Sequence, residues 1–204
     1  MQRRPIPVFP THFNLRVRDT RDAQIVFEAV RRGVLKSVSR RLNAAERSAF
    51  IQSGAIFVWE ESHDKLVAER WVDGCKWNPS RMREPFLFYE EKVTNKASND
   101  AIYRMRRREL LGFYDGTSGS TGSTSHLFDC TAHRPGGLIK QHFSDWVLDS
   151  PDSSPRRWHL MAYFTDADLQ SLPTIDNDPT LRTITIPAGV YANYRSYASS
   201  SSTQ

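Results

Sequence analysis

Residues 43–60 read NAAERSAFIQSGAIFVWE, and the change of period inside this stretch decides the fold class. Asn43 with Glu46 three residues later is the spacing of a capping box, so we expect a helix that starts here, passes Phe50 and stops at Gly54. After Gly54 the apolar period changes from 3.6 to 2, which predicts a strand over 55–60. The stretch therefore predicts a helix followed by a strand.

A second helix is expected upstream, over 19–33. Its apolar face has helical spacing, with Asp19 or Thr20 as the start and Gly33 as the end. The face comprises Ala23, Val26, Phe27, Val30 and Val34. The opposite face is interpreted as solvated surface first and as a contact surface second; it carries Arg21, Gln24, Glu28, Arg31 and Arg32. Between the helices, the adjacent Arg40 and Arg41 are candidates for a phosphate clamp.

Further along the chain, the pattern is typical of strands. We expect 65–72 to form a hairpin with 55–60, and we expect further strands at 86–89, 137–143 and 158–164. A short helix capped by Thr165 should end near Leu172, and 181–186 alternates again. Because the helices precede the strands, the pattern favours an α+β fold over a wound βαβ repeat.

Composition narrows the classes of protein. The 204 residues include 39% apolar residues and two cysteines, so a core that needs neither disulfides nor metal is expected. No apolar run reaches the length of a membrane span and no secretion signal is visible, so we expect an intracellular protein. The net charge is +5, yet residues 1–50 hold 11 basic and 4 acidic side chains. Such a concentrated positive field attracts polyanions.

Sequence motifs for catalysis are missing. The Gly/Ser/Thr run over 115–125 lacks the ending of a phosphate loop, the histidines are scattered, and the paired glutamates are sequence neighbours that point to opposite faces of a strand. We therefore expect no enzyme, no metal site and no cofactor. We interpret 93–134 as a basic, low-complexity linker. Its cluster Arg104–Arg108 is either a nuclear-import signal or a solvated run of charge.

The densest group of functional side chains lies over 70–81, which reads RWVDGCKWNPSR. Arg70 and Arg81 bracket a turn-rich loop, and a rigid loop that presents arginine suits a base edge or a narrow groove. Lys76 and Ser80 belong to the same candidate contact set. Trp71 and Trp77 are interpreted mainly as anchors of the loop on the sheet.

At this point the chain resembles the WOPR domain (Gti/Pac-type) family of fungal transcription regulators, which control morphology and development. The first half of the domain is matched by the strings at 20–23, 27–29, 33–35, 38–42, 46–48, 53–59 and 70–81. The second half is matched by GLIKQ at 137–141, with Phe143, His159-Leu160 and Tyr163. The low-complexity segment stands where the family has its variable linker.

The resemblance implies a sequence-specific DNA-binding domain. Its two halves, 11–92 and 135–197, would interdigitate into one mainly antiparallel β-sheet with flanking helices, in a single globular unit. Residues 1–10 would form an N-terminal arm and 198–204 a disordered tail. The sheet would face the major groove, and Arg70 would enter the minor groove of an A·T-rich element, which is narrow and strongly negative.

The same resemblance supplies the other site residues. Arg40, Arg41, Ser80, Arg81, Lys140 and Gln141 match family strings and are expected to contact phosphates and base edges. Asp73 and Gly74 should shape the supporting turn. Val72 stands where the family usually has threonine, so contact or regulation through that hydroxyl is in doubt.

The expected partner is double-stranded DNA with an A·T-rich site. We expect the protein to bind it as a monomer in the nucleus, without a membrane, and other transcription regulators remain open as partners. The alternative is a protein-interaction or adaptor module whose basic face docks an acidic partner. Target genes, the full target sequence and the choice between activation and repression stay open.

Overall fold

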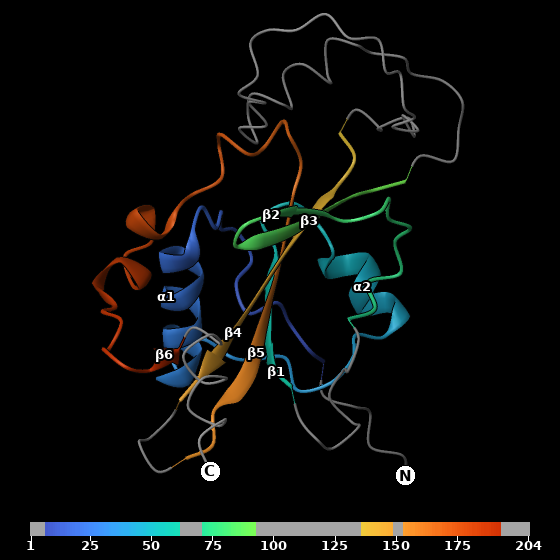
Figure 1. Cartoon of the computed structure of the whole chain (residues 1–204). Coiled ribbons are helices and arrows are strands. Elements are labelled where there is room, and N and C mark those ends of the chain that lie inside the picture. The colour runs from blue at the N-terminus through green and yellow to red at the C-terminus, as the bar shows by residue number, and fades with distance from the viewer. Residues whose placement is uncertain (1–6, 62–70, 93–135, 149–152, 193–204) are drawn as a thin grey trace, which may run out of the picture.

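The structure is a computed structural model that describes residues 7–61, 71–92, 136–148 and 153–192 (Figure 1). Several predictions fall outside these ranges: Arg70, most of the strand from Lys65, the whole 93–134 linker with Arg104–Arg108, and the tail. In chain order the elements are α1 (Thr20–Arg31), α2 (Ala44–Phe50), β1 (Ile56–Glu60), β2 (Arg81–Arg83), β3 (Phe86–Glu90), β4 (Ile139–Val147), β5 (Arg156–Phe164), the 3₁₀ helices η1 (Ile175–Asn177) and η2 (Leu181–Thr183), and β6 (Tyr191–Ala192).

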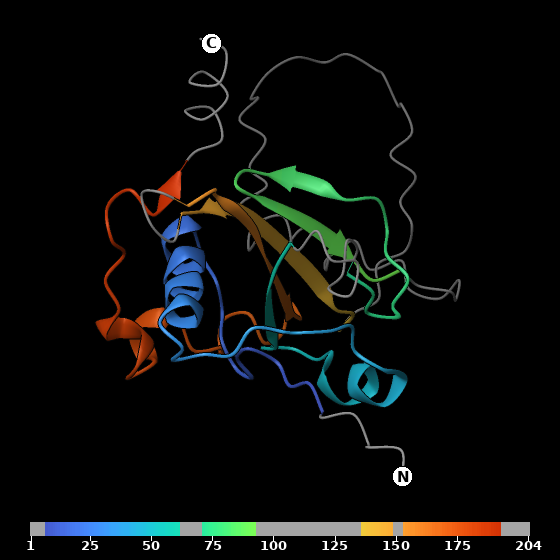
Figure 2. The ribbon, with the colours of Figure 1, turned by 90° about the horizontal axis from the view of Figure 1, so that it is seen from below.

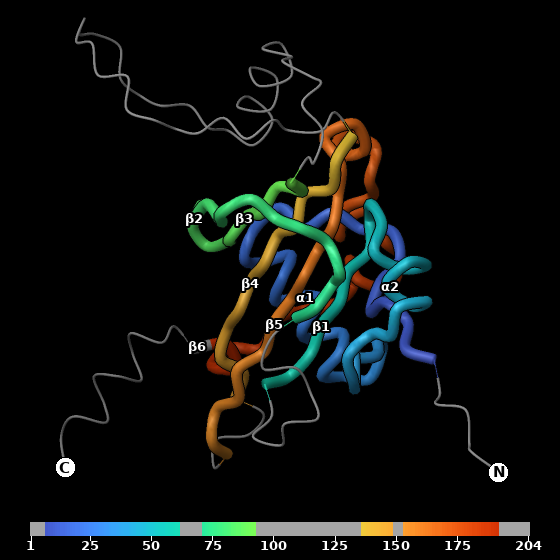
Figure 3. Tube along the Cα trace, turned by 90° about the vertical axis from the view of Figure 1, so that its right-hand side faces the viewer, coloured from blue at the N-terminus to red at the C-terminus, as the bar shows by residue number. Residues whose placement is uncertain are grey.

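One antiparallel sheet organises the described part of the chain, in the order β1-β5-β4-β3-β2, with β6 paired to the far end of β4. Strand β1 pairs with β5, where Ile56 lies opposite Ala162, and β3 pairs with β4, where Phe88 lies opposite Gln141. Figure 3 shows β4 and β5 between β1 and the β2–β3 hairpin. Strands from the C-terminal half therefore lie between strands from the N-terminal half, which confirms the interdigitated α+β fold.

The two helices lie on opposite faces of this sheet (Figures 1 and 2). On the α1 face, the ring of Phe27 packs against Phe143 and Trp158, with both centroid distances at 5.7 Å. On the α2 face, a second cluster joins Leu42 to Phe57 and Tyr163. Both faces of the sheet are buried along β1 and β5, because successive apolar side chains point to opposite faces. Burial of these side chains on both faces stabilises the sheet.

The helix ends follow the predicted capping chemistry. Asp19 accepts a hydrogen bond from the Asp22 amide at the start of α1, and the chain leaves the helix through Gly33 with φ +73°. At α2, Asn43 and Glu46 form the reciprocal capping box. These short-range signals were readable in the sequence because each depends on residues within four positions.

Part of the prediction for the solvated face of α1 is wrong. Glu28 is fully buried, and its carboxylate accepts hydrogen bonds from Arg31 (2.8 Å), Arg32 (2.6 Å) and the Tyr191 hydroxyl (3.2 Å). Val34, predicted to continue the apolar face, is 47% exposed. Strand β6 and the C-terminal segment pack beside α1, and they could not be placed from the helical pattern.

Three further element predictions need correction. In the structure β1 pairs with β5. Trp71 and Val72, the described end of the strand predicted over 65–72, are not in a strand, so this end of the predicted hairpin is wrong. Residues 166–171 form turns instead of a helix, although Thr165 does cap them through Asp168. The alternating 181–186 segment contains the 3₁₀ helix η2. Leu181 and Ile184 are buried in the cluster on the α1 face, so their alternation reflects packing against α1.

Candidate nucleic-acid interface

The segment from Trp71 to Ser80, here called the tryptophan loop, runs antiparallel beside the end of β3. The Asn78 amide donates to the Glu90 carbonyl (2.8 Å), and the Lys92 amide donates to the Lys76 carbonyl (2.7 Å). Trp77 forms an isolated bridge with Glu91. These backbone hydrogen bonds hold the loop on the sheet, and the loop continues directly into β2.

Asp73 is the centre of the network that anchors this loop. Its side chain is 6% exposed, and it accepts hydrogen bonds from Lys140 Nζ (3.0 Å), the Tyr163 hydroxyl (2.9 Å), Trp77 Nε1 (3.0 Å) and the Cys75 amide (3.1 Å). Lys140 and Tyr163 are direct cross-strand partners on β4 and β5. The loop belongs to the N-terminal half, so this carboxylate joins the two halves of the chain at the candidate site.

The two tryptophans are directed into the same network. Trp71 stacks on Trp59, with centroids 4.9 Å apart, and its Nε1 donates to the Tyr163 hydroxyl at 2.6 Å. The Lys140 ammonium lies 4.4 Å from the ring centroid of Trp77 and 4.6 Å from that of Tyr89. These cation–π contacts and the Asp73 ion pair compensate the burial of the Lys140 charge.

The turn at the centre of the loop depends on Gly74. Its φ is +82°, a conformation that side-chain-bearing residues adopt at a cost, and an added Cβ would lie 3.2 Å from Arg47 Nε. The neighbouring Cys75 is half-buried, and burial together with Asp73 raises the pKa of its thiol to about 11. The thiol is therefore protonated at neutral pH and is a poor nucleophile.

Three of the predicted contact residues, on this loop and at the start of β2, face solvent: Lys76, Ser80 and Arg81. The side chain of Arg81 is 60% exposed, and its guanidinium lies 3.6 Å from the Glu90 carboxylate, a long ion-pair distance. The guanidinium therefore remains accessible to a partner on an otherwise well-anchored support.

Lys140 and Gln141 require a correction, because both are interior residues. Lys140 is 7% exposed and paired with Asp73, and Gln141 is 3% exposed with its amide nitrogen bonded to the Val17 carbonyl at 3.2 Å. Direct contact of DNA with the Lys140 ammonium or the Gln141 amide nitrogen would require each to give up its buried partner, which leaves unsatisfied polar groups. Lys140 supports the loop, whereas Gln141 points to the other face of the sheet.

Arg40 is also committed within the protein. It forms two hydrogen bonds to Glu46 (2.8 and 2.7 Å), and the same carboxylate accepts from the amides of Val8 and Asn43. The Arg40 guanidinium, opposed by burial and assisted by these amides, lowers the pKa of Glu46 to about 2. The adjacent Arg41 is exposed, so the structure does not bring the two arginines together as one clamp.

Sequence reasoning missed Tyr163 as part of the site. Tyr163 is fully buried, and burial and the nearby Asp73 raise the pKa of its hydroxyl well above the ordinary value, so it stays a donor. Strand alternation predicts that Tyr163 faces the α2 side, but its distance from Asp73 depends on a sheet order that sequence cannot supply. Within the described ranges, no group of three or more His, Cys, Asp or Glu side chains is arranged to hold a metal ion.

Comparison with known proteins bears on this arrangement. Residues 12–110 match the model of the Gti1/Pac2 family. The cAMP-independent regulatory protein pac2 of Schizosaccharomyces pombe is 32% identical over 189 residues, which cover 83% of this chain and 77% of pac2. The global transcription regulator FGP1 of Gibberella zeae is 45% identical over 184 residues, which cover 76% of this chain and 52% of FGP1.

A structural relative has the same fold. The WOPR domain of Wor1 from Candida albicans, solved in complex with 13bp dsDNA, superposes with a TM-score of 0.60 at 24% identity, covering 88% of this chain and 92% of that one. The chain spans about 59% of the global transcription regulator sge1 of Gibberella fujikuroi, to which it is 30% identical. From the family match and the pac2 similarity, this chain belongs to the Gti1/Pac2 family.

Proposed function

We propose that this protein is a sequence-specific double-stranded DNA-binding transcription regulator that acts in the nucleus as a monomer and has no catalytic activity. The observation that carries the proposal is the tryptophan loop, which is anchored from both halves of the chain and leads to the exposed Arg81. The names of the relatives sge1 and FGP1 as global transcription regulators support the proposal.

The physical case rests on preorganisation. Asp73, Trp71 and Trp77 hold the loop in one conformation, so little conformational entropy is lost when Lys76, Ser80 and Arg81 meet a ligand. Lysine suits a phosphate as a point charge, and arginine suits a guanine edge or a narrow minor groove. Arg81 and Lys76 are therefore assigned to base or phosphate contacts.

Arg70 keeps its proposed role as the minor-groove arginine. It lies outside the described residues, but the next residue, Trp71, is held by Trp59 and Tyr163. The exposed Arg41 is proposed as a phosphate contact, and Arg40 as the residue that fixes the connector through Glu46.

The test is a selection from randomised duplexes followed by fluorescence anisotropy of the enriched sequence at several salt concentrations. We expect an enriched A·T-containing element, affinity that falls steeply with salt, and a loss of about 1–3 kcal/mol of specific binding for Arg70→Ala or Arg81→Ala. Arg21→Ala is the matched control because Arg21 is exposed on α1, whereas Arg31 binds the buried Glu28.

Two results would contradict this proposal. The first is equal losses for Arg70→Ala, Arg81→Ala and Arg21→Ala, which would leave only a general charge effect. The second is salt-sensitive binding to acidic proteins with no discrimination among duplex sequences, which would favour the adaptor function instead.

A further inference from the structure

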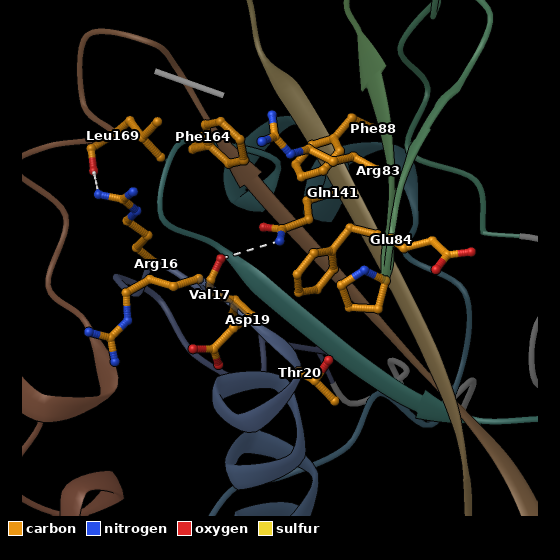
Figure 4. A pocket seen from close by; sticks show the side chains of 13 residues that line it. Arg16, Val17, Asp19, Thr20, Arg83, Glu84, Phe88, Gln141, Phe164 and Leu169 are labelled. Carbon is orange, nitrogen blue, oxygen red and sulfur yellow. Dashed lines mark hydrogen bonds between the residues drawn. The ribbon is translucent and has the colours of Figure 1, made fainter. Parts of the chain in front are cut away.

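A pocket of about 420 Å³ lies on the α1 face (Figure 4), and no residue of the tryptophan loop is among those that line it. It forms where the segment before α1, the β2–β3 turn and the ends of β4 and β5 meet. Its volume falls in the range of small-molecule sites, which are roughly 300–1,000 Å³. Segments from both halves of the chain contribute to its walls.

The floor of the pocket is apolar, with one polar group at its centre. Phe86, Phe164 and Leu169 are each 4% exposed, and Phe88 is half-buried beside them. The amide of Gln141 lies among these side chains in Figure 4, with its nitrogen bonded to the Val17 carbonyl. Among the described residues, no donor reaches its side-chain oxygen, so this oxygen is available to a ligand that carries a hydrogen-bond donor.

The charged wall of the pocket comprises three arginines and two carboxylates: Arg16, Arg18, Arg83, Asp19 and Glu84. Arg18 is neutralised by Asp22 and Asp176, both at 2.7 Å, and Asp19 is used as the cap of α1. Arg16 instead donates to a neutral group, the Leu169 carbonyl (3.0 Å), and no acidic side chain of the described residues lies within ion-pair distance. Burial, and secondarily the charge of Arg18, lower the pKa of Arg16, as expected for a cation short of counter-charge.

We propose that this pocket binds a small organic anion with a flat aromatic body. The anionic group would accept hydrogen bonds from the free N–H groups of Arg16, whose planar guanidinium matches a carboxylate or phosphate. The aromatic body would pack against Phe88 and Phe164, where ring–ring contacts add to apolar burial. A donor on the ring would reach the Gln141 oxygen.

The experiment uses matched probes on the full chain without DNA, so its outcome is independent of the proposed DNA binding. Titrations followed by ¹H–¹⁵N NMR would compare 2-naphthoate with neutral 2-naphthamide, AMP with adenosine, and inorganic phosphate alone. We expect saturable shifts at Gln141 and Phe88 with an anionic aromatic probe, and at least about tenfold weaker binding of its neutral counterpart. The carboxylate and phosphate pairs distinguish the two kinds of anionic group.

Variants separate the pocket from non-specific binding. Arg16→Gln should weaken the bound probe at least about tenfold, whereas Arg182→Gln, an equal change of charge at an exposed position outside the pocket, should not. If Arg16→Gln does not fold, Arg16→Lys supplies the test, because it keeps the charge and loses the planar fork. Equal binding of neutral and anionic probes, shifts confined to residues outside the pocket, or no saturation by any probe would overturn the proposal, and tight binding of phosphate alone would remove its aromatic part.

Discussion

At the scale of single residues, three buried carboxylates pair with cations from both halves of the chain. Glu28 holds Arg31 and Arg32, and Glu46 holds Arg40, while Asp73 holds the buried Lys140. Counting charges along the sequence treats all these cations as available to a polyanion. The structure leaves a smaller set at the proposed interface, with Arg81, Lys76 and Arg41 exposed.

The Glu46 network predicts a specific loss of stability in acid. Its folded pKa of about 2 lies below the ordinary value of 4.5, so the stabilisation is present above pH 4.5 and is lost as pH falls toward 2. Because Arg40 is partly solvated, Glu46→Gln should lower the free energy of unfolding by about 1–2 kcal/mol at neutral pH. Urea denaturation at a series of pH values measures this.

The wild-type and Glu46→Gln curves should converge as the pH falls to 2 and below, since the wild-type carboxylate becomes protonated there. Glu60→Gln is the control because Glu60 pairs with the exposed Arg156, and such surface pairs contribute at most about 1 kcal/mol. A difference between wild type and Glu46→Gln that stays constant down to pH 2 would show that this ion pair does not carry the effect.

Asp73→Asn tests the centre of the loop network. The substitution keeps the size of the side chain but leaves the buried Lys140 without a counter-charge, so it should destabilise the fold by about 3–5 kcal/mol. Asp176→Asn removes a carboxylate that is 59% exposed and should cost less than about 1 kcal/mol. Thermal and urea unfolding compare the two; similar losses would mean that Asp73 does not act as a buried anchor.

At the scale of elements, the glycines that follow α1 and α2 differ in the space around them. Gly33 and Gly54 both have positive φ, +73° and +89°, but an added Cβ at Gly33 has no atom within 4 Å. At Gly54 it would lie 3.0 Å from Leu172 Cδ2 and 3.1 Å from Asn14 Cα. Gly33 therefore carries only conformational strain, whereas Gly54 also has tight contacts with Leu172 and with the backbone of Asn14.

We expect Gly33→Ala to lower stability by about 1 kcal/mol and Gly54→Ala by clearly more, because strain and overpacking add. Chemical denaturation of the two variants measures the difference directly. Equal losses would indicate that the chain around Asn14 moves to admit the methyl group, and that the contact there is not rigid.

At the scale of the whole molecule, neither half of the chain contains the complete sheet. Strand β1 depends on β5, and β3 depends on β4, so each half separated from the other exposes strand edges and one side of both apolar clusters. The boundaries 11–92 and 135–197 remain a proposal that this dependence makes testable. In the described residues, no helix is both long and apolar enough to cross a bilayer.

Fragments 1–92 and 135–204 should each give the narrow NMR dispersion of an unfolded chain, and mixing them should restore the dispersed spectrum. A mixture in which Asp73→Asn replaces the wild-type N-terminal fragment should assemble more weakly, since Asp73 binds Lys140 and Tyr163 across the two fragments. A dispersed spectrum from either fragment alone would contradict the interdigitated dependence.

The sequence by itself determined what is local. Capping at Asp19 and Asn43, the turn at Gly74 and the strands around Phe57, Phe88 and Leu160 depend on neighbours a few positions away, and these predictions are confirmed. The interdigitated order of the strands was predicted from the family resemblance, because hydrophobic periodicity does not indicate which strands pair.

Tertiary structure alone decided which polar side chains turn inward. Lys140 and Gln141 alternate along β4 like any exposed and buried pair, yet Asp73 covers one of them from 67 residues away and Val17 accepts from the other from 124 residues away. A buried charge is tolerated only where a partner compensates its desolvation, and that partner comes from the other half of the chain. The same reason explains why Glu28 lies inside, because Arg31, Arg32 and Tyr191 donate to its carboxylate.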